Sequence, residues 1–154
     1  MNNQLLSKIM DEYFETNPPP YFSFDYGKLI PLRKLKNARK RYAYYDDEKE
    51  HPLILIDDTF FRSGKKGILI TNLHIFYRLY TKCGSNEIKK AHIALSDIKN
   101  IYINIGRQGS DLIINNKKEA FTTAFGIDSF KRTEAEILNK LFALLIETSG
   151  FIDS

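Results

Sequence analysis

The sequence has one cysteine, no tryptophan and no long apolar run. Cys83 alone cannot form an internal disulfide, so we expect a reducing compartment. A membrane-spanning helix needs roughly 18 or more consecutive apolar residues, and no stretch of the sequence approaches that length. The first residues also lack the basic segment followed by a long apolar core that marks a signal peptide. Together these absences predict a cytoplasmic protein.

Motifs for catalysis, cofactors and metals are missing as well. There is no phosphate-binding loop and no dinucleotide glycine fingerprint, and His51, His74 and His92 lack the spacings of metal ligands. Asp57 and Asp58 are adjacent, but neighbours on a strand point to opposite faces. We therefore expect no enzyme and no cofactor, and we expect one aspartate to accept a hydrogen bond from the following turn. An enzyme would need a pocket that gathers an aspartate and a histidine.

What the chain does have is enough apolar surface for a core. Hydrophobic residues make up 43% of its 154 residues and aromatic residues 13%, which argues against disorder and suits one domain with an extension. The net charge of +4 is too small by itself to identify a polyanion binder. The positive charge is concentrated, because residues 28–41 hold seven basic side chains and no acid, and residues 46–50 hold four acids.

Two amphipathic helices are predicted before residue 50. Apolar residues at positions 5, 6, 9, 10, 13 and 14 line one helical face, and the prolines at 18–20 stop that helix. Pro31 suits the first turn of a second helix, which is basic except for an apolar face of Leu32, Leu35, Ala38 and Tyr42. The charged segment 46–50 then marks a boundary between an N-terminal helical extension, residues 1–50, and a β-rich domain, residues 51–154.

The β-rich part alternates short apolar runs with turn residues. Strand composition is found at residues 53–56, 68–71, 73–80, 88–95, 101–105, 112–114 and 119–124. In the third run Leu73, Ile75, Tyr77 and Leu79 alternate with more polar or aromatic residues, the period of a strand with two different faces. About seven short strands indicate an antiparallel sandwich or barrel. A broad apolar face predicts a final helix that starts near residues 128–129 and stops at Gly150.

A family resemblance rests on residues 52–80. The string Asp57-Asp58-Thr59-Phe60, then Ser63, the run Gly67-Ile68-Leu69-Ile70-Thr71 and Tyr77 resemble a strand–turn–strand segment of bacterial pleckstrin-homology-like (PH-like) domains. The resemblance extends more loosely to the end of the chain. It implies an α+β fold, in which a strongly bent antiparallel sheet of about seven strands is capped by the C-terminal helix. It implies no reaction, since such folds host lipid-binding, peptide-binding and structural roles.

We therefore expect a non-enzymatic protein-interaction module. Proteins with the implied fold commonly offer a groove between a sheet edge and the C-terminal helix. An extended peptide can add to such an edge through backbone hydrogen bonds, which leaves little trace in side-chain motifs. The apolar first helix and the aromatic residues between 21 and 26 would also allow homo-oligomers.

Two alternatives use the basic residues. The first is binding to an anionic membrane surface, through Arg33, Lys34, Lys36, Lys40, Arg41, Arg62, Lys65 and Lys66. Lipid-binding PH domains place basic residues in a comparable turn, but the strand after residues 62–66 carries no basic residue, which departs from the phosphoinositide-binding pattern. The second and less favoured alternative is nucleic-acid binding by the basic helix, with bases stacked on Tyr42, Tyr44 and Tyr45.

Overall fold

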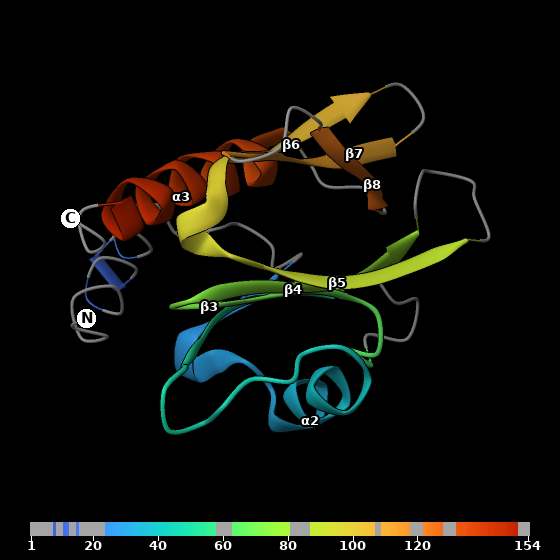
Figure 1. Cartoon of the computed structure of the whole chain (residues 1–154), viewed down its shortest axis with the longest axis vertical. Helices are drawn as coiled ribbons and strands as arrows, with labels where there is room; N and C mark the ends of the chain where they lie inside the picture. Colours follow the sequence, from blue (N-terminus) through green and yellow to red (C-terminus); the bar gives the residue numbers. More distant parts are fainter. Residues whose placement is uncertain are drawn as a thin grey trace.

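The structure is a computed structural model that describes residues 24–57, 63–80, 87–106, 109–117, 122–127 and 132–150, together with residues 8, 11, 12 and 15. In chain order the elements are β1 (Asp25–Tyr26), the 3-10 helix η1 (Gly27–Leu29), α2 (Leu32–Arg41), β2 (Pro52–Asp57), β3 (Gly67–Thr71), β4 (His74–Tyr80), β5 (Ile88–Ala94), the 3-10 helix η2 (Leu95–Asp97), β6 (Ile98–Gly106), β7 (Gly109–Asn116), β8 (Thr122–Ile127) and α3 (Arg132–Gly150). The architecture is α+β, with an antiparallel sheet and a C-terminal helix (Figure 1).

The eight strands form one antiparallel sheet built from two meanders. The strand order is β1-β2-β3-β4-β8-β7-β6, and β5 pairs with β4 off this path. Strands β4 and β5 pair along their full length, whereas β4 and β8 meet at a single pair, Tyr80 with Gly126. Among the described residues the second meander, β6–β8, therefore pairs with the first at the end of β4. Figure 1 shows the two halves facing each other with α3 beside the β6–β8 half.

The larger core lies between the two meanders and α3. Apolar residues of α3 recur at helical spacing and bury one face of the helix: Ala135, Leu138, Leu141, Phe142 and Leu145. They pack with the buried side chains of β2–β4, β6 and β7, which include Ile54, Ile68, Ile75, Ile103 and Leu112. Helix α3 thus closes the sheet by burying apolar surface, the main stabilising contribution in a domain of this size.

A second core lies on the opposite face of β2–β4, beneath α2. Ala38 and Tyr42 pack there against one buried side chain from each strand, namely Leu55, Leu69 and Phe76. Strands β2–β4 are consequently covered on both faces, which explains their continuous apolar runs. The predicted alternation is confirmed within β4, since Ile75, Tyr77 and Leu79 lie in the larger core and Phe76 lies under α2. Leu73 was predicted on the same face as Ile75, but it precedes β4 and is 39% exposed.

The predicted order of strands followed by one helix is confirmed, with differences before residue 50. The two-residue strand β1 was not predicted, because a pairing this short leaves no periodicity to detect. The first predicted helix lies mostly outside the described residues, where residues 8, 11, 12 and 15 alone are described and are helical. The second of the two expected N-terminal helices is thus present as α2. The expected start of the final helix, residues 128–129, also lies outside them.

Candidate interaction surfaces

Lys34 differs from the other basic residues of α2 because it is buried. Its side-chain ammonium lies 2.8 Å from Asp25 Oδ2 and 3.6 Å from Asp57 Oδ2, and the residue is 8% exposed. Buried charges are tolerated when they are paired. The two ion pairs of Lys34 connect α2 to β1 through Asp25 and to β2 through Asp57. Lys34 was expected among residues that contact an anionic surface, and the structure places its side chain inside the domain, paired with the two aspartates.

The turn before β3 is held against α2. Asn37 Nδ2 donates a hydrogen bond of 2.7 Å to Ser63 O, and the Gly64 N–H donates one of 3.1 Å to Asp57 Oδ2. Gly64 has φ +73°, and a Cβ there would lie 2.5 Å from Lys34 O, so only glycine fits. The expected hydrogen bond from the turn to an aspartate is confirmed at Asp57, and the structure brings the two predicted basic segments together.

The exposed face of α2 collects most of the remaining expected basic residues. Arg33, Lys36 and Lys40 are exposed and have the spacing i, i+3, i+7, so they share one helical face. Leu32 and Leu29 stand beside them in the sequence, 78% and 64% exposed. Arg41 and Lys65 are exposed too and Lys66 is half-buried, whereas Arg62 lies outside the described residues.

The three clustered tyrosines after α2 have different environments. Tyr42 and Tyr45 are buried, and only Tyr44 is exposed, at 64%. Burial raises the pKa of the Tyr42 phenol, with the Asp57 carboxylate adding to the rise and Arg78 opposing it. The Tyr42 hydroxyl has no hydrogen-bond partner among the described residues. A stacking surface that used all three rings, as the nucleic-acid alternative requires, is therefore not formed.

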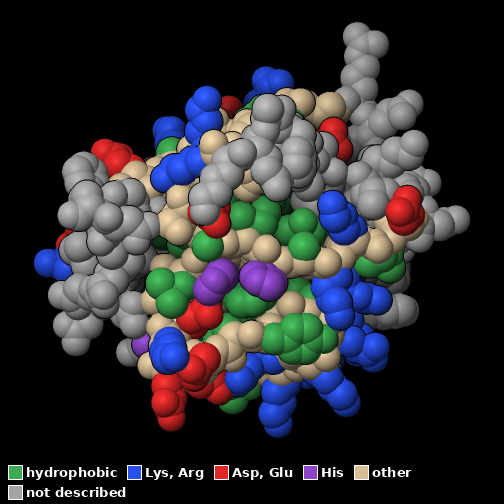
Figure 2. All heavy atoms as spheres, viewed as in Figure 1, with side chains coloured by type: hydrophobic (Ala, Val, Ile, Leu, Met, Phe, Trp, Pro, Cys, Tyr) green, Lys and Arg blue, Asp and Glu red, His purple; other side chains and the backbone are tan. Residues whose placement is uncertain are grey.

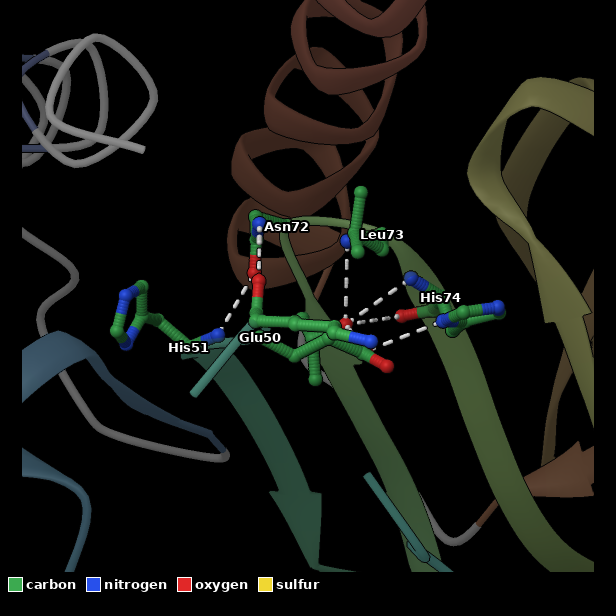
Figure 3. Close-up of polar contacts among 7 residues, drawn as sticks. Glu50, His51, Asn72, Leu73 and His74 are labelled. Carbon is green, nitrogen blue, oxygen red and sulfur yellow. Dashed lines mark hydrogen bonds and ion pairs between the residues drawn. The ribbon is translucent and has the colours of Figure 1, made fainter. Parts of the chain in front are cut away.

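Glu50, Thr71 and His74 form a polar network where β2 begins (Figure 3). The buried Glu50 carboxylate accepts a hydrogen bond of 2.5 Å from Thr71 Oγ1, which itself accepts from the N–H groups of Leu73 and His74. His74 Nδ1 lies 3.1 Å from Glu50 Oε2, at ion-pair distance but not aligned as a hydrogen bond. Asn72 adds a link to the His51 backbone N–H at 2.7 Å. The network fixes the β3–β4 turn against the start of β2.

The catalytic and metal-ligating candidates of the sequence are not gathered into one site in the part of the chain that the structure describes. His74 and His92 lie side by side, with ring centroids 5.9 Å apart, and Figure 2 shows histidine side chains grouped near the centre of the face in view. Within the described residues no three His, Cys, Asp or Glu side chains gather as metal ligands. Asp57 is engaged by Lys34 and the Gly64 N–H, while Asp58 and Cys83 lie outside the described residues.

The edge of β6 next to α3 is occupied by a side chain. Asn139 Oδ1 accepts a hydrogen bond of 2.6 Å from the Ile103 N–H, and Asn139 Nδ2 donates one of 3.0 Å to Ile103 O. The amide thus replaces a neighbouring strand at this residue, which is how buried backbone groups avoid the cost of lost hydrogen bonds. The expected groove between a sheet edge and the C-terminal helix is closed at this point on β6.

Strand β5 presents an open edge of seven residues. It pairs with β4 from Ile88 to Ala94 and, among the described residues, has no strand on its other side. Each of its side chains is exposed or half-buried, and Ala91 and Ile93 are the ones that pack partly against the larger core. An edge strand of this kind carries unpaired N–H and C=O groups that can bond to another extended chain.

Comparisons with known proteins are sparse. No family model and no curated protein matches the sequence. The chain is similar to the crystal structure of a DUF1696 family protein with a pleckstrin-homology domain from Shewanella loihica PV-4, at 11% identity and a TM-score of 0.48, over 76% of this chain and 94% of that one. Separately, no described helix has the length and apolar character needed to cross a membrane.

Proposed function

We propose that this chain is a PH-like, non-enzymatic interaction module that binds an extended peptide by adding it to the open edge of β5. The sequence resemblance over residues 52–80 and the order of elements, two antiparallel meanders followed by one helix, support the PH-like assignment. The observation that carries the function is the edge itself, which pairs with β4 on one side and has no neighbouring strand among the described residues on the other. The amide of Asn139 leaves β6 less available for the same role.

The test uses two blocked heptapeptides, neutral Thr-Val-Thr-Val-Gln-Gln-Thr and acidic Thr-Val-Thr-Val-Glu-Glu-Thr, each also prepared with N-methyl groups at alternate residues. N-methylation removes backbone donors and leaves the side chains unchanged, so it blocks strand addition specifically. We expect at least one unmethylated peptide to shift the β5 amide signals in nuclear magnetic resonance (NMR) spectra of the whole labelled chain. The proposal fails if neither peptide shifts them, or if the methylated versions bind equally well.

A second candidate function is binding to an anionic membrane surface through the exposed face of α2. The observation that favours it is the combination of Arg33, Lys36 and Lys40 on one face with the exposed Leu29 and Leu32. Basic side chains are attracted to anionic lipid headgroups by about 1 kcal/mol each near the surface. Exposed apolar side chains beside them can enter the boundary between headgroups and acyl chains.

Co-sedimentation with anionic and neutral vesicles tests this candidate. Charge reversal at Arg33, Lys36 and Lys40 should abolish retention on anionic vesicles, whereas reversal at Lys89 and Lys90 should not. Physiological salt should weaken retention, because exposed charges are screened over about 8 Å. Retention that is equal for both sets of variants would exclude the face of α2 as the contact surface.

A further inference from the structure

Short contacts link three basic residues and Tyr44 at the exposed side of the β4–β5 hairpin. Arg78 and Lys90 lie directly opposite each other on β4 and β5. Arg78 Nη1 donates a hydrogen bond of 2.9 Å to Lys65 O, and Lys90 Nζ lies 3.4 Å from Tyr44 Oη and 5.3 Å from the ring centroid. Tyr44 Oη in turn donates to Arg41 O at 3.2 Å. We call Lys65, Arg78, Lys90 and Tyr44 the cationic cluster.

The cationic cluster has no carboxylate partner within the described part of the chain. The ion pairs of the neighbouring segments involve Lys34, Arg39 and Lys49, and none of them includes Lys65, Arg78 or Lys90. Figure 2 shows Lys and Arg side chains gathered on one side of the face of the molecule that is in view. The local charge is therefore positive, and the acids of residues 46–50 do not neutralise it.

The pairing of Arg78 with Lys90 is a local conflict. Like charges directly opposite each other on neighbouring strands destabilise a sheet, and sequences break such rules mainly at functional sites. Lys89 adds a further positive charge at the next position of β5, where it is exposed. Two adjacent lysines on an open edge also oppose pairing with the same edge of a second copy, so they disfavour a homodimer and leave the edge for a chain of opposite charge.

We propose that the open edge of β5 recognises an extended segment with two adjacent acidic residues, whose carboxylates lie opposite Lys89 and Lys90. The inference rests on the proposed strand addition and adds the chemistry of the partner. Neighbouring residues of a strand point to opposite faces, so two adjacent acids are needed to meet both lysines. On the face of Lys89, Ala91 and Ile93 pack against the larger core, and the segment should place apolar side chains opposite them.

The comparison of the acidic and neutral heptapeptides tests this specificity. Exposed ion pairs contribute modestly, so we expect the acidic peptide to bind roughly fivefold tighter than the neutral one at low salt. Lys89→Gln and Lys90→Gln together should remove the difference. The matched control is Lys36→Gln with Lys40→Gln, which removes the same charge from the exposed face of α2 and should leave the difference unchanged. The amide spectrum of each variant checks that it is folded.

The outcomes separate this inference from the strand addition on which it depends. If both peptides bind at β5 with equal affinity, strand addition stands and the acidic specificity is overturned. If the acidic peptide and its N-methylated version bind equally, the cluster binds anions without strand addition, and the inference is overturned together with the proposed function. If the control variants remove the preference as fully as the β5 variants do, the preference reflects net charge, and the roles of Lys89 and Lys90 are overturned.

Discussion

Tyr42 carries a buried hydroxyl that has no hydrogen-bond partner among the described residues, and we predict that Tyr42→Phe raises the free energy of unfolding. The side chain is 2% exposed and lies in the core beneath α2. Its hydroxyl finds no hydrogen bond among the described residues, so folding removes it from water without compensation. An unsatisfied buried polar group costs roughly 1–3 kcal/mol, and phenylalanine keeps the ring while removing that cost.

The expected gain lies near the lower end of that range. Removing the oxygen also removes its packing contacts and leaves a small void, so we expect a net gain of about 1 kcal/mol. For a chain of this size that gain would raise the melting temperature by about 2–4 °C. In urea titrations the midpoint should rise, while the slope should stay unchanged because the exposed surface on unfolding is the same.

The matched control is Tyr44→Phe. Tyr44 is exposed to solvent, so the hydrogen bond from its hydroxyl to Arg41 O contributes little to stability. Tyr44→Phe should therefore change the free energy of unfolding by no more than about 0.5 kcal/mol. A loss of stability for Tyr42→Phe larger than that of the control would refute the reasoning, because it would mean that the Tyr42 hydroxyl makes a favourable interaction in the folded protein.

Three further predictions follow from single contacts. Asn139→Ala should lower the free energy of unfolding by roughly 1–3 kcal/mol in urea titrations, since it leaves the buried N–H and C=O of Ile103 without their partner; an unchanged midpoint would contradict this. Gly64→Ala should lower the free energy of unfolding by more than about 1 kcal/mol, because φ is positive at Gly64 and an added Cβ would meet Lys34 O. An equal or higher melting temperature would contradict this. Burial raises the pKa of three tyrosines in the folded state, so the stability they contribute is fully present below about pH 10 and is lost as the pH rises above it. In absorbance titrations these three phenols should ionise at a higher pH in the folded protein than after unfolding: Tyr42, Tyr45 and Tyr77.

Most of the strands could be predicted because each leaves a local pattern. The alternation around Ile75 and Tyr77 and the turn chemistry at Gly64 require only neighbouring residues to interpret. Strand β1 could not be predicted in this way, since two residues carry no period. The double burial of β2–β4 also depends on α2 lying over one face, which is a long-range arrangement.

The roles of the basic residues were only partly predictable. Helical spacing places Arg33, Lys36 and Lys40 on one face, and the structure agrees. The same spacing cannot show that Lys34 points inward, because its partners Asp25 and Asp57 come from separate segments of the chain.

Neither the cationic cluster nor the hydrogen bonds of the Asn139 amide could be predicted, because in both cases the partners come from separate segments of the chain. Arg78 and Lys90 belong to different strands, and their opposition follows from the register of β4 with β5. Asn139 is one of several polar residues in α3, and nothing in the sequence connects it to Ile103.

The central claim is that β5 has an open edge among the described residues, whereas the edge of β6 is closed at Ile103 by Asn139 of α3. Amide hydrogen exchange of the free protein tests this claim most directly. We predict that alternate amides of β5, those that do not bond to β4, exchange quickly, because only water is bonded to them. The amide of Ile103 should be protected by Asn139, and it should lose that protection in Asn139→Ala. If all the amides of β5 are protected as strongly as those of the doubly paired β3, the edge is covered in solution and the account is contradicted.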